Sequence, residues 1–216
     1  MDEAQVRQRE PVESLILYNL FKWSVVSPML HAYFGGKIYG LEHVPLSGPL
    51  VVVSNHASYF DPPIVSNCVC RPVAFMAKEE LFQVPVLKDA IRLYGAYPVR
   101  RGSSDRKAMQ AAMSYLREGW AIGLFLQGTR TPDARITDPK LGAALIAAKT
   151  NAPLLPVSLW GTNTILSKGS SFPKPVPVTV RIGEIIPTPS STDREELEAV
   201  TQRCVEAIHA MHDLGR

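Results

Sequence analysis

From residue 35 onward, short apolar runs alternate with segments of helical periodicity. Two of the runs, 50–54 (LVVVS) and 121–126 (AIGLFL), contain almost no polar residues, which is typical of strands that are covered on both faces. Between 109 and 116, four apolar residues recur at helical spacing, and Gly119 follows as a stop signal. Strands that alternate with helices in this way indicate helical crossovers, so the sequence predicts an α/β fold.

The pattern predicts about seven strands and a C-terminal helix. The strand ranges are 38–41, 50–54, 73–77, 96–99, 121–126, 154–159 and 178–182. After Thr192, apolar side chains at 197, 200, 204, 208 and 211 fall on one helical face, which favours a helix packed on the sheet.

Composition limits the class of protein and of partner. With 216 residues, 46% of them hydrophobic, the chain can bury one sizeable core, and we expect a single globular domain. The formal net charge of +3 is too small to indicate nucleic-acid binding but suits an anionic small molecule or membrane surface. Cys68, Cys70 and Cys204 complete neither a disulfide set nor a zinc site, so we expect a reducing compartment and no metal.

The apolar stretch 14–34 raises the question of a membrane span, but several polar residues and Pro28 interrupt it. On a helical wheel, five of its apolar residues fall on one arc, and Pro28 is a site where the helix can kink. The arc consists of Leu17, Tyr18, Phe21, Val25 and Met29. Such a helix fits two arrangements, one in the membrane interface and one packed on its own domain. The residues before it do not resemble a secretory signal, so we expect the cytoplasmic side.

Residues 54–63 (SNHASYFDPP) follow a predicted buried strand and place His56 and Asp61 close together, with four residues between them. Active sites of open α/β sheets lie at the carboxyl ends of strands, so this is where catalytic residues are expected. Alone, Asp61 before Pro62 is a good helix N-cap, and a lone histidine is often only a buried side chain. Together they suggest acid–base chemistry, because a carboxylate on one ring nitrogen stabilises the imidazolium that forms at the other.

The sequence offers His56 no protein nucleophile. It contains no G-x-S-x-G elbow, and Ser54 and Ser58 lack the glycines of such a turn. A general base without a protein nucleophile can take its proton from a substrate hydroxyl. We therefore expect an acceptor alcohol, and a serine hydrolase is an alternative that the missing elbow disfavours.

Two further predicted strands end in motifs with arginine and glycine, 95–102 (GAYPVRRG) and 125–132 (FLQGTRTP). Arginine forks suit phosphate, and glycine lets the backbone approach an anion closely. Each motif alone is a weak signal, because surface arginines are usually solvated. If both strand ends meet the one that carries His56, they form a crevice for a phosphorylated alcohol.

Four blocks of the sequence follow the order of a known family. NHASYFD has the pattern N-H-x-x-x-x-D, GAYPVRR resembles G-x-x-x-V-x-R, FLQGTR resembles F-P-E-G-T-R, and APLLPVSL resembles a final strand with proline. The chain resembles the glycerolipid acyltransferases, most closely the bacterial-type 1-acylglycerol-3-phosphate acyltransferases. The blocks are spread over Ser54 to Leu159, which is about half of the chain, and their combination is far more specific than any one of them.

The resemblance implies that an acyl group passes from a thioester of acyl carrier protein or coenzyme A to the hydroxyl of lysophosphatidate, which gives phosphatidate. It implies no cofactor and no covalent enzyme intermediate. His56 corresponds to the general base and Asp61 to its orienting partner. Arg101 and Arg130 correspond to phosphate contacts, and Lys78 is a further candidate, in a stretch often found between the first two blocks.

The resemblance also implies a fold and a location. We expect an acyltransferase domain at 35–216 with a central, mostly parallel sheet flanked by helices, preceded by a membrane-associating helical segment at 1–34. Because a lipid acceptor is reached from the membrane surface, the interfacial helix is now favoured. We therefore expect a peripheral or monotopic protein on the cytoplasmic face of the membrane.

One block departs from the family pattern, since Gln127 stands where glutamate is usual and Leu126 where proline is usual. Gln127, Gly128 and Thr129 are assigned to the region that positions the acceptor or the oxyanion. Glutamine can still accept a hydrogen bond but lacks the charge. This leaves open another acceptor, such as a different lysophospholipid or glycerol 3-phosphate, and a lipid-binding homologue with impaired turnover.

Overall fold

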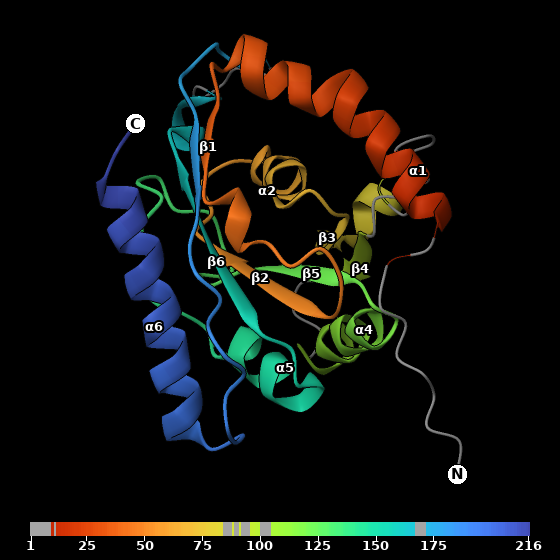
Figure 1. Cartoon of the computed structure of the whole chain (residues 1–216), viewed down its shortest axis with the longest axis vertical. Helices are drawn as coiled ribbons and strands as arrows, with labels where there is room; N and C mark the ends of the chain where they lie inside the picture. Colours follow the sequence, from red (N-terminus) through yellow and green to blue (C-terminus); the bar gives the residue numbers. More distant parts are fainter. Residues whose placement is uncertain are drawn as a thin grey trace.

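The computed structural model describes residues 10, 12–83, 88, 91, 96–99, 105–166 and 172–216 of the chain. Within them, a central sheet is covered by helices on both faces (Figure 1). The strands are β1 (Lys37–Tyr39), β2 (Leu50–Ser54), β3 (Val73–Lys78), β4 (Tyr97–Val99), β5 (Ala121–Phe125), β6 (Leu154–Trp160) and β7 (Thr179–Ile182).

These described strands form one sheet of seven in the order β1-β7-β6-β2-β5-β3-β4. Every neighbouring pair is parallel except β6 and β7. The prediction of an α/β domain with a mostly parallel sheet is confirmed, and each predicted strand overlaps an observed one.

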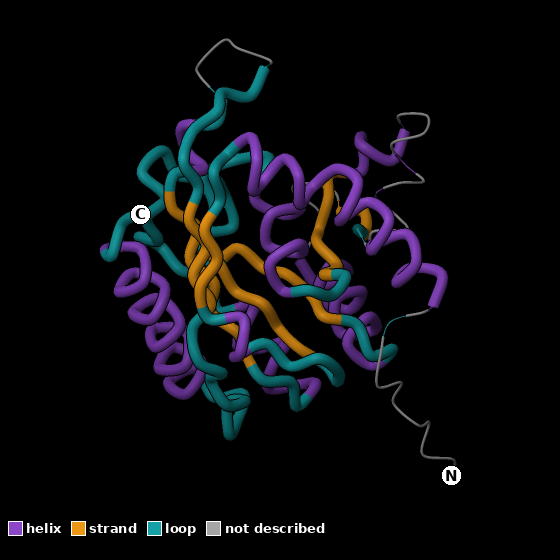
Figure 2. Tube along the Cα trace, turned by 45° about the horizontal axis from the view of Figure 1, so that its top comes forward, coloured by secondary structure: helices purple, strands orange, loops and turns teal. Residues whose placement is uncertain are grey.

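The helices separate into two groups (Figures 1 and 2). One face of the sheet carries α2 (Asp61–Val69) and an N-terminal stretch of α1 (Val12–Phe21) and two π-helical turns, η1 (Lys22–Val26) and η2 (Met29–Tyr33). The other carries α4 (Asp105–Arg117), α5 (Gly142–Thr150) and α6 (Arg194–Asp213). The short 3₁₀ turns are η3 (Leu41–His43), η4 (Glu79–Gln83) and η5 (Thr162–Thr164).

The position of β2 between two layers of helices explains why its sequence is continuously apolar. Val51 and Val53 pack in the cluster that contains the α4, α5 and α6 side chains, while Leu50 and Val52 pack in the cluster on the α2 side. Successive side chains of a strand point to opposite faces, so a strand with helices on both sides needs apolar residues at every position.

The N-terminal stretch packs on the domain through a face that the sequence did not reveal. Buried residues recur at every fourth position, namely Ser14, Tyr18, Lys22, Val26, Leu30 and Phe34, and Ser27 is buried beside Val26. An α-helix turns through more than a full circle in four residues, and the wider π-helical turns compensate for that drift. The predicted apolar arc is therefore wrong as a single face, because Tyr18 points inward while Phe21 and Val25 are exposed.

A buried ion pair holds the start of this stretch, since Arg71 Nη2 lies 2.6 Å from Glu10 Oε1 and both side chains are almost fully buried. Arg71 also donates hydrogen bonds to the carbonyls of Pro45, Gly48 and Gly119. The guanidinium therefore links the N-terminal stretch to loops at the amino-terminal ends of β2 and β5. Over the described ranges, every helix is too short or too polar to cross a membrane.

Candidate active site

The candidate site lies where β2, β5 and β6 end side by side. Ser54 is paired in register with Phe125 of β5 and with Val157 of β6, and His56 follows two residues later. The carboxyl ends of these parallel strands thus meet, as the sequence predicted, and His56 stands at their centre.

Asp61 is the first residue of α2, and its carboxylate turns back toward the preceding loop. Its Oδ2 accepts hydrogen bonds from His56 Nδ1 at 2.8 Å and from the backbone N–H groups of Ala57 and Ser58, each at 2.7 Å. Phe60 is the N-cap, so Asp61 orients the histidine loop and does not cap the helix. The side chain of Asp61 is fully buried, which keeps this pairing away from water.

The hydrogen bond to Asp61 determines what the imidazole of His56 can do. A carboxylate only accepts, so Nδ1 of His56 carries a hydrogen, and in the neutral ring Nε2 has the free lone pair. The His56 side chain is 17% exposed, so it is partly open to the solvent side. The pair is arranged to accept a proton at Nε2 and to stabilise the resulting imidazolium.

Asn55 fixes the position of His56 from the core side. Its Nδ2 donates to the carbonyls of Leu159 at 2.8 Å and Ala134 at 3.0 Å, and its Oδ1 accepts from the Leu159 N–H at 2.8 Å. This buried amide joins the end of β2 to the end of β6 and to the loop after β5. Sequence reasoning included Asn55 in a motif but gave it no role.

The loop 126–141 closes the site from the β5 side. Its Thr131 N–H donates to the carbonyl of His56 at 2.8 Å, and the Lys140 N–H donates to the carbonyl of Leu126 at 2.8 Å. Gly128 has a φ of +72°, a conformation that suits glycine, and its N–H donates to Phe125. The backbone of His56 is therefore held by a loop that begins at β5.

The side chain of Gln127 makes hydrogen bonds within the loop 126–141. Its Oε1 accepts hydrogen bonds from the backbone N–H groups of Thr137 at 2.8 Å and Asp138 at 2.9 Å, and Nε2 lies 3.4 Å from the hydroxyl of Thr137. A glutamate oxygen could accept the same two bonds. The oxygen of Gln127 is thus engaged within the loop.

The same loop is tied to α6 on its outer side. The Ile136 N–H donates to His209 Nε2 at 3.1 Å, and Arg135 pairs with Asp213. Burial, and next the charge of Arg135, holds the pKa of His209 below its usual value. His209 must be neutral to accept this bond, so the lowered pKa and the geometry agree.

Arg130 reaches toward the His56 loop and is exposed. Its guanidinium carbon lies 3.6 Å from the ring centroid of Tyr59, and Nη2 donates to the Tyr59 hydroxyl at 2.8 Å. A small hollow of about 110 Å³ lies beside this pair, lined by Ala57, Ser58, Tyr59, Arg130, Thr162, Asn163 and Leu166. Arg130 therefore contacts the loop that follows His56 through Tyr59.

The remaining predicted site residues differ in how far the structure describes them. Arg101 lies outside the described residues. Lys78 ends β3, where it is in register with Val99 of β4, and its side chain also lies outside them. Gly128 and Thr129 are exposed in the turn after β5. Among the described residues, no group of three or more His, Cys, Asp or Glu side chains could hold a metal ion.

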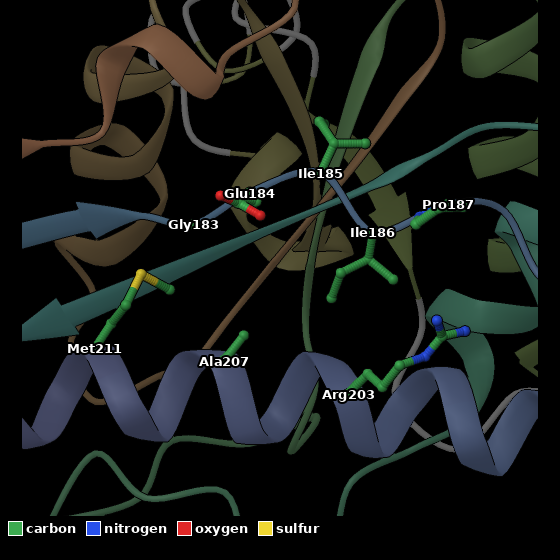
Figure 3. A pocket seen from close by; sticks show the side chains of 8 residues that line it. All are labelled: Gly183, Glu184, Ile185, Ile186, Pro187, Arg203, Ala207 and Met211. Atoms are coloured by element: carbon green, nitrogen blue, oxygen red, sulfur yellow. The ribbon is translucent and has the colours of Figure 1, made fainter.

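A larger hollow of about 410 Å³ lies elsewhere, between α6 and residues 183–187 (Figure 3). Arg203, Ala207 and Met211 of α6 face Ile186 across it. None of the predicted site residues lines it, whereas Arg130 lines the smaller hollow together with Ala57, Ser58 and Tyr59 of the loop that follows His56.

Comparison with known proteins adds three findings. A family model described as Acyltransferase matches residues 36–160. A chloroplastic 1-acyl-sn-glycerol-3-phosphate acyltransferase of Brassica napus is 33% identical over 151 residues, which are 68% of this chain and 43% of that protein. A 1-acyl-sn-glycerol-3-phosphate acyltransferase of Bacillus subtilis is 27% identical over 183 residues, which are 83% of this chain and 89% of that protein.

The fold is similar to a solved structure. The crystal structure of the 1-acyl-sn-glycerophosphate (LPA) acyltransferase PlsC from Thermotoga maritima superposes with a TM-score of 0.71 at 27% identity, covering 91% of this chain and 79% of that chain. The chain spans about half or less of the length of the plant relatives that it matches, from 42% for a protein of Arabidopsis thaliana to 52% for one of Cocos nucifera.

Proposed function

Because the chain belongs to the acyltransferase family, we propose that it transfers a fatty acyl group from an acyl thioester to the free hydroxyl of lysophosphatidate. The observation that carries this proposal is the His56–Asp61 hydrogen bond at the carboxyl end of β2. It leaves one imidazole nitrogen free to accept a proton, and the exposed Arg130 contacts Tyr59 in the loop that follows His56. The product is phosphatidate.

The reaction needs no protein nucleophile. His56 Nε2 takes the proton of the acceptor hydroxyl while that oxygen attacks the thioester carbonyl carbon. The tetrahedral intermediate then expels the thiolate as the carbon–sulfur bond breaks, and the imidazolium returns its proton to the sulfur. The Asp61 carboxylate stabilises the imidazolium between these two steps, because it is fixed by two backbone N–H groups as well as by His56.

Arg130 is proposed to bind the phosphate of the acceptor. A guanidinium presents several N–H donors in a fixed fork that matches phosphate oxygens, and the Tyr59 ring holds its plane in place. Arg101 and Lys78 are proposed as further contacts on the basis of the sequence resemblance. Two or three cations near the carboxyl ends of neighbouring strands suit the doubly charged phosphate of lysophosphatidate.

Membrane association is proposed through the outer side of the N-terminal stretch. Val12, Ile16, Leu20 and Trp23 follow one another at helical spacing and are between 64% and 69% exposed. A run of large apolar side chains on one helix face supports insertion into the interface between headgroups and acyl chains. We propose peripheral or monotopic attachment on the cytoplasmic face, where the acceptor is within reach.

The donor is proposed to be a thioester of acyl carrier protein or of coenzyme A. The lipid-binding alternative rested on Gln127, whose oxygen accepts two loop N–H groups that a glutamate oxygen could accept as well. Its departure from the usual residue is therefore compatible with turnover.

The proposal is tested by thiol release from palmitoyl-carrier protein and palmitoyl-CoA, with and without detergent-dispersed lysophosphatidate. We expect release that requires the acceptor, and a loss of roughly two to four orders of magnitude in His56→Ala. The preferred donor follows from the same assay. Release at the native rate in a folded His56→Ala variant would remove the general base from the account, and release without acceptor would indicate a thioesterase.

A further inference from the structure

Phe125 is the last residue of β5, and its ring lies flat against the imidazole of His56. The two ring centroids are 3.8 Å apart, and the planes differ by 11°. We propose that Phe125 is a positioning residue, whose ring holds the His56 imidazole in the orientation from which Nε2 takes the acceptor proton. This inference rests on the proposed role of His56 as the general base.

The hydrogen bond to Asp61 alone does not fix the imidazole. It holds one ring atom, Nδ1, at 2.8 Å from Oδ2 and leaves the ring able to tilt about that contact. A flat ring against one face removes the tilt, because the two planes must stay nearly parallel. The two contacts together determine where Nε2 lies, and the efficiency of proton transfer depends on that position.

The contact also strengthens when the reaction requires it. An aromatic face attracts a cation, and the imidazole of His56 becomes a cation only after it has taken the proton. An interaction that is stronger in the transition state than before it raises kcat and leaves KM almost unchanged. Asp61 stabilises this cation through the ring edge, and Phe125 does so through the ring face.

Phe125 is itself supported from the core. Its ring is stacked on Phe75 of β3, with centroids 5.3 Å apart and planes 21° apart. Phe75 is in register with Gly123 of β5, where an added Cβ would lie 2.2 Å from Phe75 Cε1. The missing side chain at 123 thus lets the Phe75 ring lie across β5 and reach Phe125, which is two residues further on the same face. The result is a stack of three rings that begins in the buried cluster and ends at His56.

The test compares Phe125→Leu and Phe125→Met with the native chain in the acceptor-dependent thiol-release assay. We expect kcat to fall by roughly tenfold to a hundredfold, while KM for donor and acceptor changes by less than about threefold. Phe125→Tyr keeps the ring and should retain most of the native kcat. Using two aliphatic variants guards against one of them failing to fold, and thermal unfolding identifies the folded one.

Two controls separate positioning from a general loss of stability. Tyr115→Leu breaks another aromatic stack, with Tyr97 at 5.3 Å in the cluster on the other face, and should lower stability while kcat stays native. In a His56→Ala background, Phe125→Leu should cause no further loss of the residual rate, because its effect passes through the imidazole.

The outcomes distinguish this inference from the proposed function. If His56→Ala is inactive while folded Phe125→Leu and Phe125→Met keep the native kcat, the positioning role is wrong and the general base stands. A further loss on adding Phe125→Leu to His56→Ala would also overturn the inference. If His56→Ala itself keeps the native rate, the proposed function fails first.

Discussion

The two sides of the site are built in different ways. On the side of the proposed general base, His56 and Asp61 are held by a buried network in which the Asp61 Oδ2 alone accepts three hydrogen bonds. On the side of the proposed phosphate contact, Arg130 is exposed, and Tyr59, which is 64% exposed, is the partner that holds it among the described residues. The His56–Asp61 pair is fixed by buried contacts, whereas Arg130 is exposed to solvent.

The difference follows from what each side has to do. A general base must present one nitrogen at one place, so rigidity raises the rate. A phosphate contact must admit a charged lipid headgroup and release the product, which an exposed side chain allows. Mutations on the first side should therefore lower kcat, and mutations on the second should raise KM for the acceptor.

The largest effect is expected for Asp61→Asn. The variant keeps the size of the side chain but removes the charge that stabilises the imidazolium, so kcat should fall by roughly two to four orders of magnitude. Acceptor KM should change little. Steady-state kinetics with a circular-dichroism check of folding measures this, and a drop confined to KM would contradict a fixed catalytic side.

A smaller effect is expected for Arg130→Ala. Losing a charge-assisted contact in a solvated place should raise acceptor KM by about tenfold and leave kcat within a few-fold of native. Arg194→Ala is the matched control, since it removes the same charge from an exposed position on α6 and should leave both constants unchanged. If kcat for Arg130→Ala falls as far as for Asp61→Asn, Arg130 acts in the chemical step, and the separation into a catalytic side and a binding side is wrong.

Some variants of Gln127, which lies in the loop that bears Arg130 and contacts the His56 backbone, should change the stability of the protein. Gln127→Leu leaves the Thr137 and Asp138 N–H groups without their acceptor, and the free energy of unfolding should fall by about 1 kcal/mol for this half-exposed position. Gln127→Glu keeps an acceptor oxygen and should be as stable as native, with rates within about threefold of native. Denaturant unfolding and thiol release measure the two quantities. Equal destabilisation by both variants would contradict the assigned hydrogen bonds.

The smallest effect is a pH dependence at the outer anchor of the loop. The folded pKa of His209 is lowered, so folding favours its neutral form, and the stability it contributes is complete above pH 6.5 and declines as the pH falls toward the folded pKa. His209→Gln keeps an acceptor for the Ile136 N–H and cannot titrate, so its unfolding midpoint should vary less between pH 7 and pH 5.

The surroundings of His209 supply the control for this measurement. Arg135, Asp213, Asp133 and His212 act on its pKa or lie beside it, and the pKa of His212 is also lowered, by burial and then by Arg135. His212→Gln should remove its own share of the pH dependence and leave the Ile136 bond in place. A pH dependence that is unchanged in His209→Gln would assign the effect to another group.

The sequence predicted the sheet better than it predicted the packing of the N-terminal stretch. Continuous apolar runs mark strands with two covered faces, and the C-terminal helix was marked by Leu197, Val200, Cys204 and Ile208, all buried in the structure. In the N-terminal stretch, the wheel places Tyr18, Phe21 and Val25 on one arc, but Tyr18 is buried and the other two are exposed, and from Lys22 onward π-helical turns also change the periodicity. Lys22, a polar residue, is buried there.

Within the site, sequence blocks located His56, Asp61 and Arg130 but not the residues that support them. Asn55 meets partners 79 and 104 residues away, and the oxygen of Gln127 meets N–H groups ten and eleven residues away in a loop without periodicity. Local patterns carry no information about such contacts. The ring of Phe125 belongs to the same class, because stacking on His56 depends on how β5 and β2 lie in register.

The most direct test of the central claim is a search for an acyl-enzyme. The native chain is mixed with palmitoyl-CoA or palmitoyl-carrier protein in the absence of acceptor, quenched within one turnover, and examined by intact-mass spectrometry together with the thiol released. A general-base mechanism predicts an unmodified chain and no thiol burst until lysophosphatidate is added. A stoichiometric burst with a palmitoyl adduct on the chain would contradict it, because the acyl group would then pass through a protein nucleophile.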